Sequence, residues 1–164
     1  MAGIAPKRRV APATRGQRFA VVVARFNEPI SKKLLDGALA ALASHAVSGD
    51  AVEVHWVPGS FELPQAARAL ARTRRFAGIV CVGVVIKGAT PHFEYVCRAA
   101  AQGISRVGLD TGIPVTFGLI TALTEEQARE RAGGAVGNRG EEAALAALEM
   151  AAWLRGLGSR RRKR

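Results

Sequence analysis

The sequence predicts an α/β fold in which a four-stranded parallel sheet is covered by helices on both faces. Four short apolar runs, rich in Val and Ile, are typical of strands that are buried on both sides. They alternate with longer segments whose apolar residues recur at helical spacing, which is the pattern of a parallel sheet with right-handed crossovers. The 164 residues suffice for one domain with a substantial core.

The predicted order of elements is βαβαβαβαα. The strands are predicted over residues 18–25, 51–57, 76–86 and 115–121, and the helices over 30–46, 61–75, 92–107, 124–132 and 141–155.

In the first half, the run RFAVVVAR forms a continuous apolar strand that the sequence FNEP ends. The helix after it carries apolar side chains at helical intervals, namely Leu34, Leu35, Ala38, Leu39 and Leu42. The next strand, AVEVHWV, is closed by PGS. Pro64 then stands in the first turn of the second helix, a position that suits proline.

In the second half, a third apolar run leads through a glycine-rich turn into a helix that begins near His92. Pro114 precedes the fourth strand. The sequence TEEQ, starting at Thr124, has the form of a capping box and predicts a short helix. The chain is then interrupted by four glycines (Gly133, Gly134, Gly137 and Gly140), and an Ala-rich helix follows.

The net charge of +11 lies at the two ends of the chain. Residues 1–18 carry five basic residues and residues 155–164 carry six, with no acid in either segment, which accounts for the whole excess. We therefore expect a basic, disordered leader (1–17) and a basic tail (157–164) around a neutral domain (18–156). Nucleic acid would bind only non-specifically, through these tails and in a salt-sensitive way.

No apolar run approaches the ~20 residues of a membrane span, and the N-terminus lacks the apolar stretch of a signal peptide. These observations predict a soluble, cytoplasmic protein without membrane contact.

The cysteines and histidines do not predict a metal site. Cys81 falls in an apolar strand and Cys97 in a helix, and both are expected to be buried, reduced thiols. Neither thiol shows metal-ligand spacing with His45, His55 or His92. A Cys97 nucleophile served by His92 is disfavoured, because five residues along a helix do not share a face.

Candidate chemistry concentrates in the segment GVVIKGATPH, residues 83–92. A turn between a strand and a helix N-terminus offers backbone N–H groups to a phosphate, and His92 is able to move a proton near neutral pH. The segment fits a P-loop except that Ala89 replaces the Lys, which weakens an NTPase interpretation. From this turn alone, a purely structural connection is about equally well supported.

Five motifs in order along the chain closely resemble the lumazine synthase family. They are RFN at 25–27, WVPGSFELP at 56–64, GVVIKGATPH at 83–92 with YVC at 95–97, PVTFG at 114–118, and ERAG at 130–133 with GNRG at 137–140. Together they cover nearly all of the chain outside the tails. One such motif would be a weak signal, whereas five in register are a strong one.

The resemblance implies a flavodoxin-like three-layer fold and a cofactor-independent enzyme of riboflavin biosynthesis. The reaction would condense 5-amino-6-(D-ribitylamino)uracil with 3,4-dihydroxy-2-butanone 4-phosphate to 6,7-dimethyl-8-ribityllumazine. His92 would be the catalytic proton donor and acceptor. The pyrimidine and ribityl chain would contact Phe26, Ser60, Phe61, Glu62, Val84, Val85, Ile86 and Phe117, and the phosphate Ala89, Thr90 and Arg131.

The resemblance also implies a homo-oligomer with its site between subunits, Phe117 coming from a neighbour, and a functional link to riboflavin synthase. We expect a pentamer and favour its closure into an icosahedral shell of sixty subunits, with an isolated pentamer or decamer as the alternative. Charge near the phosphate departs from many relatives at Lys87, Ala135 and Arg139. Two rival functions remain: a riboflavin synthase of the archaeal type, and a non-enzymatic shell or flavin-storage module.

Overall fold

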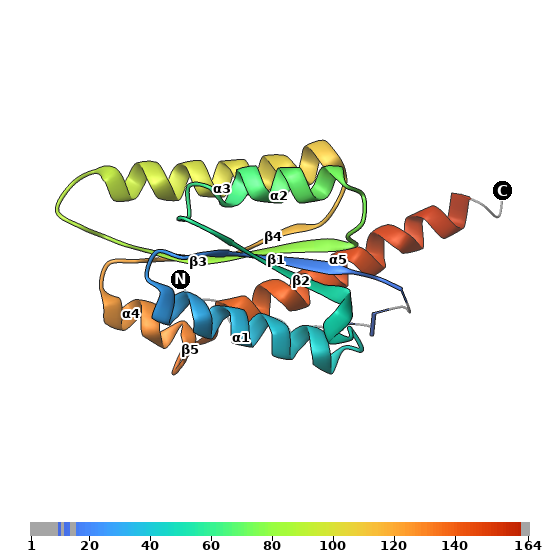
Figure 1. Cartoon of the computed structure of the whole chain (residues 1–164), viewed down its shortest axis with the longest axis horizontal. Coiled ribbons are helices and arrows are strands. Elements are labelled where there is room, and N and C mark those ends of the chain that lie inside the picture. The colour runs from blue at the N-terminus through green and yellow to red at the C-terminus, as the bar shows by residue number, and fades with distance from the viewer. Residues whose placement is uncertain (1–9, 11, 14–15, 162–164) are drawn as a thin grey trace.

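The computed structural model describes residues 10, 12–13 and 16–161, with side chains described as far as residue 158. It has the predicted flavodoxin-like α/β fold, in three layers (Figure 1). The sheet contains β1 (Phe19–Ala24), β2 (Val52–Val57), β3 (Gly78–Ile86) and β4 (Val115–Ala122). The helices are α1 (Glu28–Ser44), η1 (Gly49–Ala51), α2 (Leu63–Arg72), α3 (His92–Thr111), α4 (Glu125–Glu130) and α5 (Arg139–Arg161).

All strands of the sheet are parallel and lie in the order β2-β1-β3-β4. The two central strands, β1 and β3, are buried for most of their length, as their unbroken apolar sequences predict. Because the strands are parallel, their carboxyl ends meet at one edge of the sheet, where the loops that lead into the helices gather.

Each face of the sheet packs on its own helices (Figure 1). On one face, alternate residues of β1 and β3 such as Val21 and Val82 contact α1 and α5. On the other face, Val22 and Cys81 contact α2 and α3. Burying apolar side chains on both faces is the main source of stability in such a layered domain.

Several element boundaries differ from the prediction: α2 is shorter (Leu63–Arg72 against 61–75), α3 is longer (to Thr111 against 107), and α1 and α5 each begin two residues earlier. Helix α1 begins at Glu28 rather than residue 30, because Asn27 takes the left-handed conformation (φ 58°) and turns the chain immediately after β1. The glycine-rich segment, expected only to break the chain, forms an antiparallel hairpin of β5 (Ala132–Gly134) and β6 (Gly137–Asn138). Gly133 and Gly137 have positive φ angles, which glycine adopts without strain.

Residues 157–161 of the predicted basic tail continue α5. Basic residues are good helix formers and are favoured near a helix C-terminus, so the basic composition does not end the helix. Of the predicted leader, Val10 and Ala13 pack against the core, and Ala13 N–H donates to His45 O at 2.8 Å. Residues 1–9, 11, 14–15 and 162–164 lie outside the described part of the chain.

Within the described residues, no helix has the length and apolar character needed to cross a membrane.

Candidate active site

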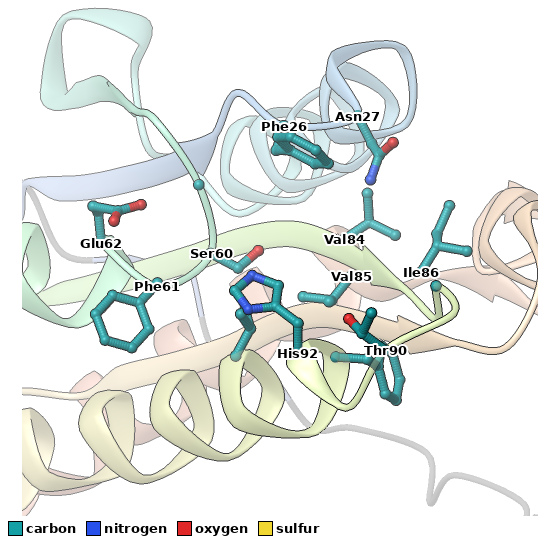
Figure 2. A pocket seen from close by; sticks show the side chains of 14 residues that line it. Phe26, Asn27, Ser60, Phe61, Glu62, Val84, Val85, Ile86, Thr90 and His92 are labelled. Atoms are coloured by element: carbon teal, nitrogen blue, oxygen red, sulfur yellow. The ribbon is translucent and has the colours of Figure 1, made fainter.

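A hollow lined by residues of the motifs lies at the carboxyl ends of β1, β2 and β3 (Figure 2). Its volume is about 520 Å³, which is within the usual range for small-molecule sites. It is lined by Phe26, Asn27, Gly59, Ser60, Phe61, Glu62, Val84, Val85, Ile86, Gly88, Thr90, His92, Phe93 and Val96. A mostly apolar wall with a few polar groups is typical of a small-molecule site.

The loops after β1 and β2 are tied together at this edge. Arg25 N–H donates to Val57 O at 2.8 Å, and Phe26 N–H donates to Pro58 O at 3.1 Å. These bonds hold the Phe26 ring at the mouth of the hollow, where it is 71% exposed. An aromatic side chain that is held in place yet exposed provides a stacking surface for a planar ligand.

Ser60 is the polar residue buried deepest in the wall. Its side chain is only 5% exposed, and its hydroxyl has no hydrogen-bond partner among the described residues. A buried hydroxyl without a partner costs free energy unless a ligand or water satisfies it. Glu62, at the start of α2, supplies the carboxylate on the same side of the hollow (Figure 2).

The third wall is the end of β3 and the start of α3. Val84, Val85 and Ile86 belong to the strand, so residues 83–90 do not form one continuous phosphate loop, and the P-loop comparison fails here. Lys87 N–H donates to Ala122 O at 2.9 Å, which fixes the turn against the end of β4. The N-cap residue of α3, Pro91, makes no side-chain capping bond, which leaves a site suited to an anion beside Thr90.

His92 is the first residue of α3, and its exposed imidazole projects into the hollow toward Ser60 (Figure 2). It therefore faces the same space as Phe26 and Glu62. The combination of stacking surface, carboxylate, imidazole and uncapped helix agrees with the chemistry that the motifs imply.

The chain matches the family described as 6,7-dimethyl-8-ribityllumazine synthase over residues 16–155. It is a member of the 6,7-dimethyl-8-ribityllumazine synthase family. The resemblance drawn from the five motifs is thereby confirmed, and the family's activity is the formation of a lumazine in riboflavin biosynthesis.

Nine of the twelve residues that the lumazine synthase motifs single out line the hollow together; the other three, Ala89, Phe117 and Arg131, do not. Phe117 is the third residue of β4 and pairs in register with Cys81, so it lies nearer the amino end of the strand than the carboxyl end that borders the hollow. Its ring is 44% exposed on an edge strand. Arg131 follows α4 and donates from Nη1 to Gln127 O at 2.9 Å.

Five lining residues were missed as site residues by the sequence reasoning: Asn27, Gly59, Gly88, Phe93 and Val96. Asn27 and Gly59 adjoin predicted site residues, and Gly88 lies in the predicted turn. Val96 could have been found from helical spacing, because a residue four positions after His92 lies on the same face, whereas Phe93 follows His92 directly and carries no such signal.

The residues at which this chain differs in charge from many lumazine synthases, Lys87, Ala135 and Arg139, lie outside the hollow. Arg139 pairs with the Glu142 carboxylate, three residues later on α5. Lys87 and Ala135 are exposed and do not line the hollow. Within the described residues, no Arg or Lys side chain lines this hollow.

Both cysteines are free thiols; Cys81 is buried as predicted, whereas Cys97 is only partly buried. Burial raises the pKa of the Cys81 thiol to about 12 and also raises that of the partly buried Cys97. Both are therefore protonated at neutral pH, which makes them poor nucleophiles. Among the described residues, no group of three or more His, Cys, Asp or Glu side chains could hold a metal ion.

Proposed function

We propose that this protein condenses 5-amino-6-(D-ribitylamino)uracil with 3,4-dihydroxy-2-butanone 4-phosphate to form 6,7-dimethyl-8-ribityllumazine, phosphate and water. The observation that carries the proposal is that nine residues from three separate motifs of the family line one hollow of about 520 Å³. The catalytic domain would comprise residues 18–156.

In this proposal the pyrimidine stacks on Phe26, and its ribityl chain runs along Ser60, Phe61 and Glu62. The buried hydroxyl of Ser60 supports this, because a ribityl hydroxyl would supply its missing partner. The exposed Phe26 ring gains apolar contact when a flat ring covers it. Val84, Val85 and Ile86 would contact the edge of the ring.

His92 would act as the proton donor and acceptor. Attack of the pyrimidine amine on the ketone first requires proton movement, so that water leaves and an imine forms. A proton is then taken from carbon so that phosphate departs, and the second amine closes the ring with loss of water. A neutral imidazole serves as acceptor and then donor at each stage. Holding both reactants in register would supply much of the acceleration.

The phosphate would bind at Ala89, Thr90 and the N-terminus of α3, with Arg131 as its cationic partner. Because the hollow has no Arg or Lys among its described lining side chains, we propose that a neighbouring copy supplies Arg131. The same copy would contribute Phe117, whose ring is exposed on the edge strand β4. A site completed in this way requires a homo-oligomer, and we propose a pentamer that closes into a sixty-subunit shell.

Steady-state turnover by the purified protein tests the activity. The expected result is consumption of both substrates with stoichiometric lumazine and phosphate. Formation of riboflavin from lumazine would instead identify the riboflavin synthase alternative, and no turnover in an assembled oligomer would indicate a storage or shell module.

Mass photometry at several ionic strengths tests the assembly. Shell formation is expected to improve with salt, because eleven uncompensated charges per subunit repel one another when gathered on one side of a shell. Particles no larger than decamers at every ionic strength would exclude the shell, and a catalytically active monomer would exclude the shared site.

A further inference from the structure

The side chain of Asn138 joins two helices that are distant in sequence. Its Nδ2 donates to Lys33 O of α1 at 2.8 Å. Its Oδ1 accepts from Gly140 N–H at 2.9 Å and from Glu141 N–H at 3.2 Å, in the first turn of α5. The amide orientation is determined by these partners, because only the NH₂ group donates to a carbonyl and only the oxygen accepts from N–H groups. Asn138 is therefore the N-cap of α5 and also a clamp on α1.

Two glycines make room for this clamp. A β-carbon on Gly37 of α1 would lie 2.4 Å from the Asn138 carboxamide. A β-carbon on Gly140 of α5 would lie 1.9 Å from Leu34 O, again on α1. Glycine in the middle of a helix is unfavourable unless close approach requires it. The presence of Gly37 inside α1 is explained by the side chain that it admits.

Asn138 is the neighbour in sequence of Arg139, whose backbone N–H bonds to the carbonyl oxygen of Arg131. Arg139 N–H donates to Arg131 O at 2.9 Å, and Val136 N–H donates to Glu130 O at 3.1 Å across the same hairpin. The hairpin that connects Arg131 to α5 is short, with strands of three and two residues. Two contacts hold this hairpin on α1: the Asn138 bond to Lys33 O, and the burial of Ala132 in the core that α1 shares.

We propose that Asn138 is a positioning residue for Arg131, setting the place of that guanidinium through the hairpin while touching no substrate. The inference rests on the proposed function in one respect, namely that Arg131 binds the phosphate of the four-carbon substrate. Asn138 does not line the hollow, so its effect is transmitted through the backbone of residues 131–139. Small displacements of a binding group from its productive geometry are costly, which makes such a support necessary.

The test distinguishes the capping bonds that Asn138 makes to α5 from its bond to Lys33 O of α1. Asn138→Asp keeps an oxygen that caps α5 and loses the donor to Lys33 O, whereas Asn138→Ser keeps a capping hydroxyl on a side chain too short to cap α5 and reach Lys33 O together. The expected result is a rise of about tenfold or more in KM for the phosphate substrate, with the KM of the pyrimidine changed by less than about twofold. Gly37→Ala provides a second route, because its methyl group displaces the carboxamide while alanine suits the helix, and it is expected to give the same split.

Two controls distinguish positioning from general loosening. Thr73→Ala removes the hydroxyl bond to Leu70 O at the end of α2, away from the hairpin, and is expected to leave both KM values unchanged. In an Arg131→Ala background, Asn138→Asp is expected to raise the phosphate KM no further, because the two residues act through one contact. An equal rise in both KM values, or additive effects in the double variant, would overturn the inference.

Direct binding of inorganic phosphate, measured by calorimetry on the assembled protein, keeps this test independent of turnover. Asn138→Asp is expected to weaken phosphate binding in the wild-type background and to have no effect with Arg131→Ala. If the protein turns nothing over but shows this pattern, the proposed reaction fails and the positioning role stands. If the wild-type protein turns substrate over and Asn138→Asp binds phosphate normally, the reaction stands and the positioning role fails. Absence of both turnover and phosphate binding would reject both.

Discussion

The hydroxyl of Ser60 lies 3.2 Å from the position that a β-carbon on Gly83 would occupy. The same β-carbon would lie 2.8 Å from the side chain of Ala24. Glycine within β3 therefore allows the loop after β2 to fold its serine inward over the sheet. This places a buried hydroxyl without a described partner in the wall of the candidate active site.

Ser60→Ala is expected to weaken binding of the pyrimidine substrate by about tenfold, because one hydrogen bond is lost. The stability of the free protein is not expected to fall. Removing an unpartnered buried hydroxyl leaves stability unchanged or raises it by about 1 kcal/mol. Ser31→Ala is the matched control, because Ser31 is equally buried but donates to Phe26 O, and its loss is expected to destabilise. Thermal melts and pyrimidine titrations check both. A large loss of stability in Ser60→Ala would contradict this account.

His92→Ala is expected to lower kcat by about 100-fold and to leave measurable activity, because positioning supplies part of the rate. His45→Ala, at the end of α1 and outside the hollow, is the control and is expected to retain normal kcat. Steady-state kinetics with both substrates saturating measures the effect. Complete inactivity with unchanged fold and assembly would show that His92 has a role beyond proton transfer.

Arg131→Ala is expected to raise KM for the phosphate substrate by about 10- to 100-fold, the loss of a charged hydrogen bond, with little effect on the pyrimidine. Arg129→Ala on α4, two residues before Arg131, removes an equal charge that pairs with Glu125, and it is expected to leave both KM values near normal. Initial rates with each substrate varied in turn provide the comparison. An equal rise in the KM of both substrates would contradict the assignment of Arg131 to the phosphate site.

Gly140→Ala is expected to destabilise the protein by about 2 kcal/mol or more, because the added methyl group would collide with the backbone of Leu34. Gly156→Ala, also in α5 but with nothing within 4 Å of the added atom, is expected to be neutral or to stabilise by up to about 1 kcal/mol. Urea unfolding of the two variants measures the difference. Similar free energies of unfolding for the two variants would mean that α1 and α5 move apart without destabilising the protein.

The ion pairs of Glu53 are expected to stabilise the fold at neutral pH and to lose this effect at acid pH. Burial by itself would raise the pKa of Glu53, but hydrogen bonds from Arg18, at 3.0 Å, and from Arg75 outweigh it and hold the pKa below its ordinary value of 4.5. A lowered pKa stabilises the fold above the pKa of the unfolded chain, and this contribution is lost as pH falls through the folded value. The Tm difference between wild type and Glu53→Gln is therefore expected to be full at pH 7 and to narrow below about pH 4. A constant difference down to pH 3 would contradict the ion-pair account.

The sequence by itself determined the parallel α/β fold, because both underlying signals are local. Apolar runs such as VVV in β1 and helical spacing such as Leu34 to Leu42 in α1 depend only on which faces of an element are buried. The capping box was predicted in the same way, and Thr124 accepts from Gln127 N–H at 3.2 Å. The position of His92 at the start of a helix followed from the same local pattern, and the grouping of Phe26 with Ser60–Glu62 was implied by the family resemblance.

Only the tertiary structure decided which of these residues share a space. Phe117 and Arg131 have motifs as clear as that of His92, yet they lie outside the hollow of their own chain. The partner of Asn138 is 105 residues earlier in the chain, and the glycines that admit this contact look like simple helix breakers in the sequence. Local patterns report burial and backbone preference. Which long-range groups meet depends on how α1, α5 and the hairpin pack around the sheet, and that packing fixes distances no local pattern contains.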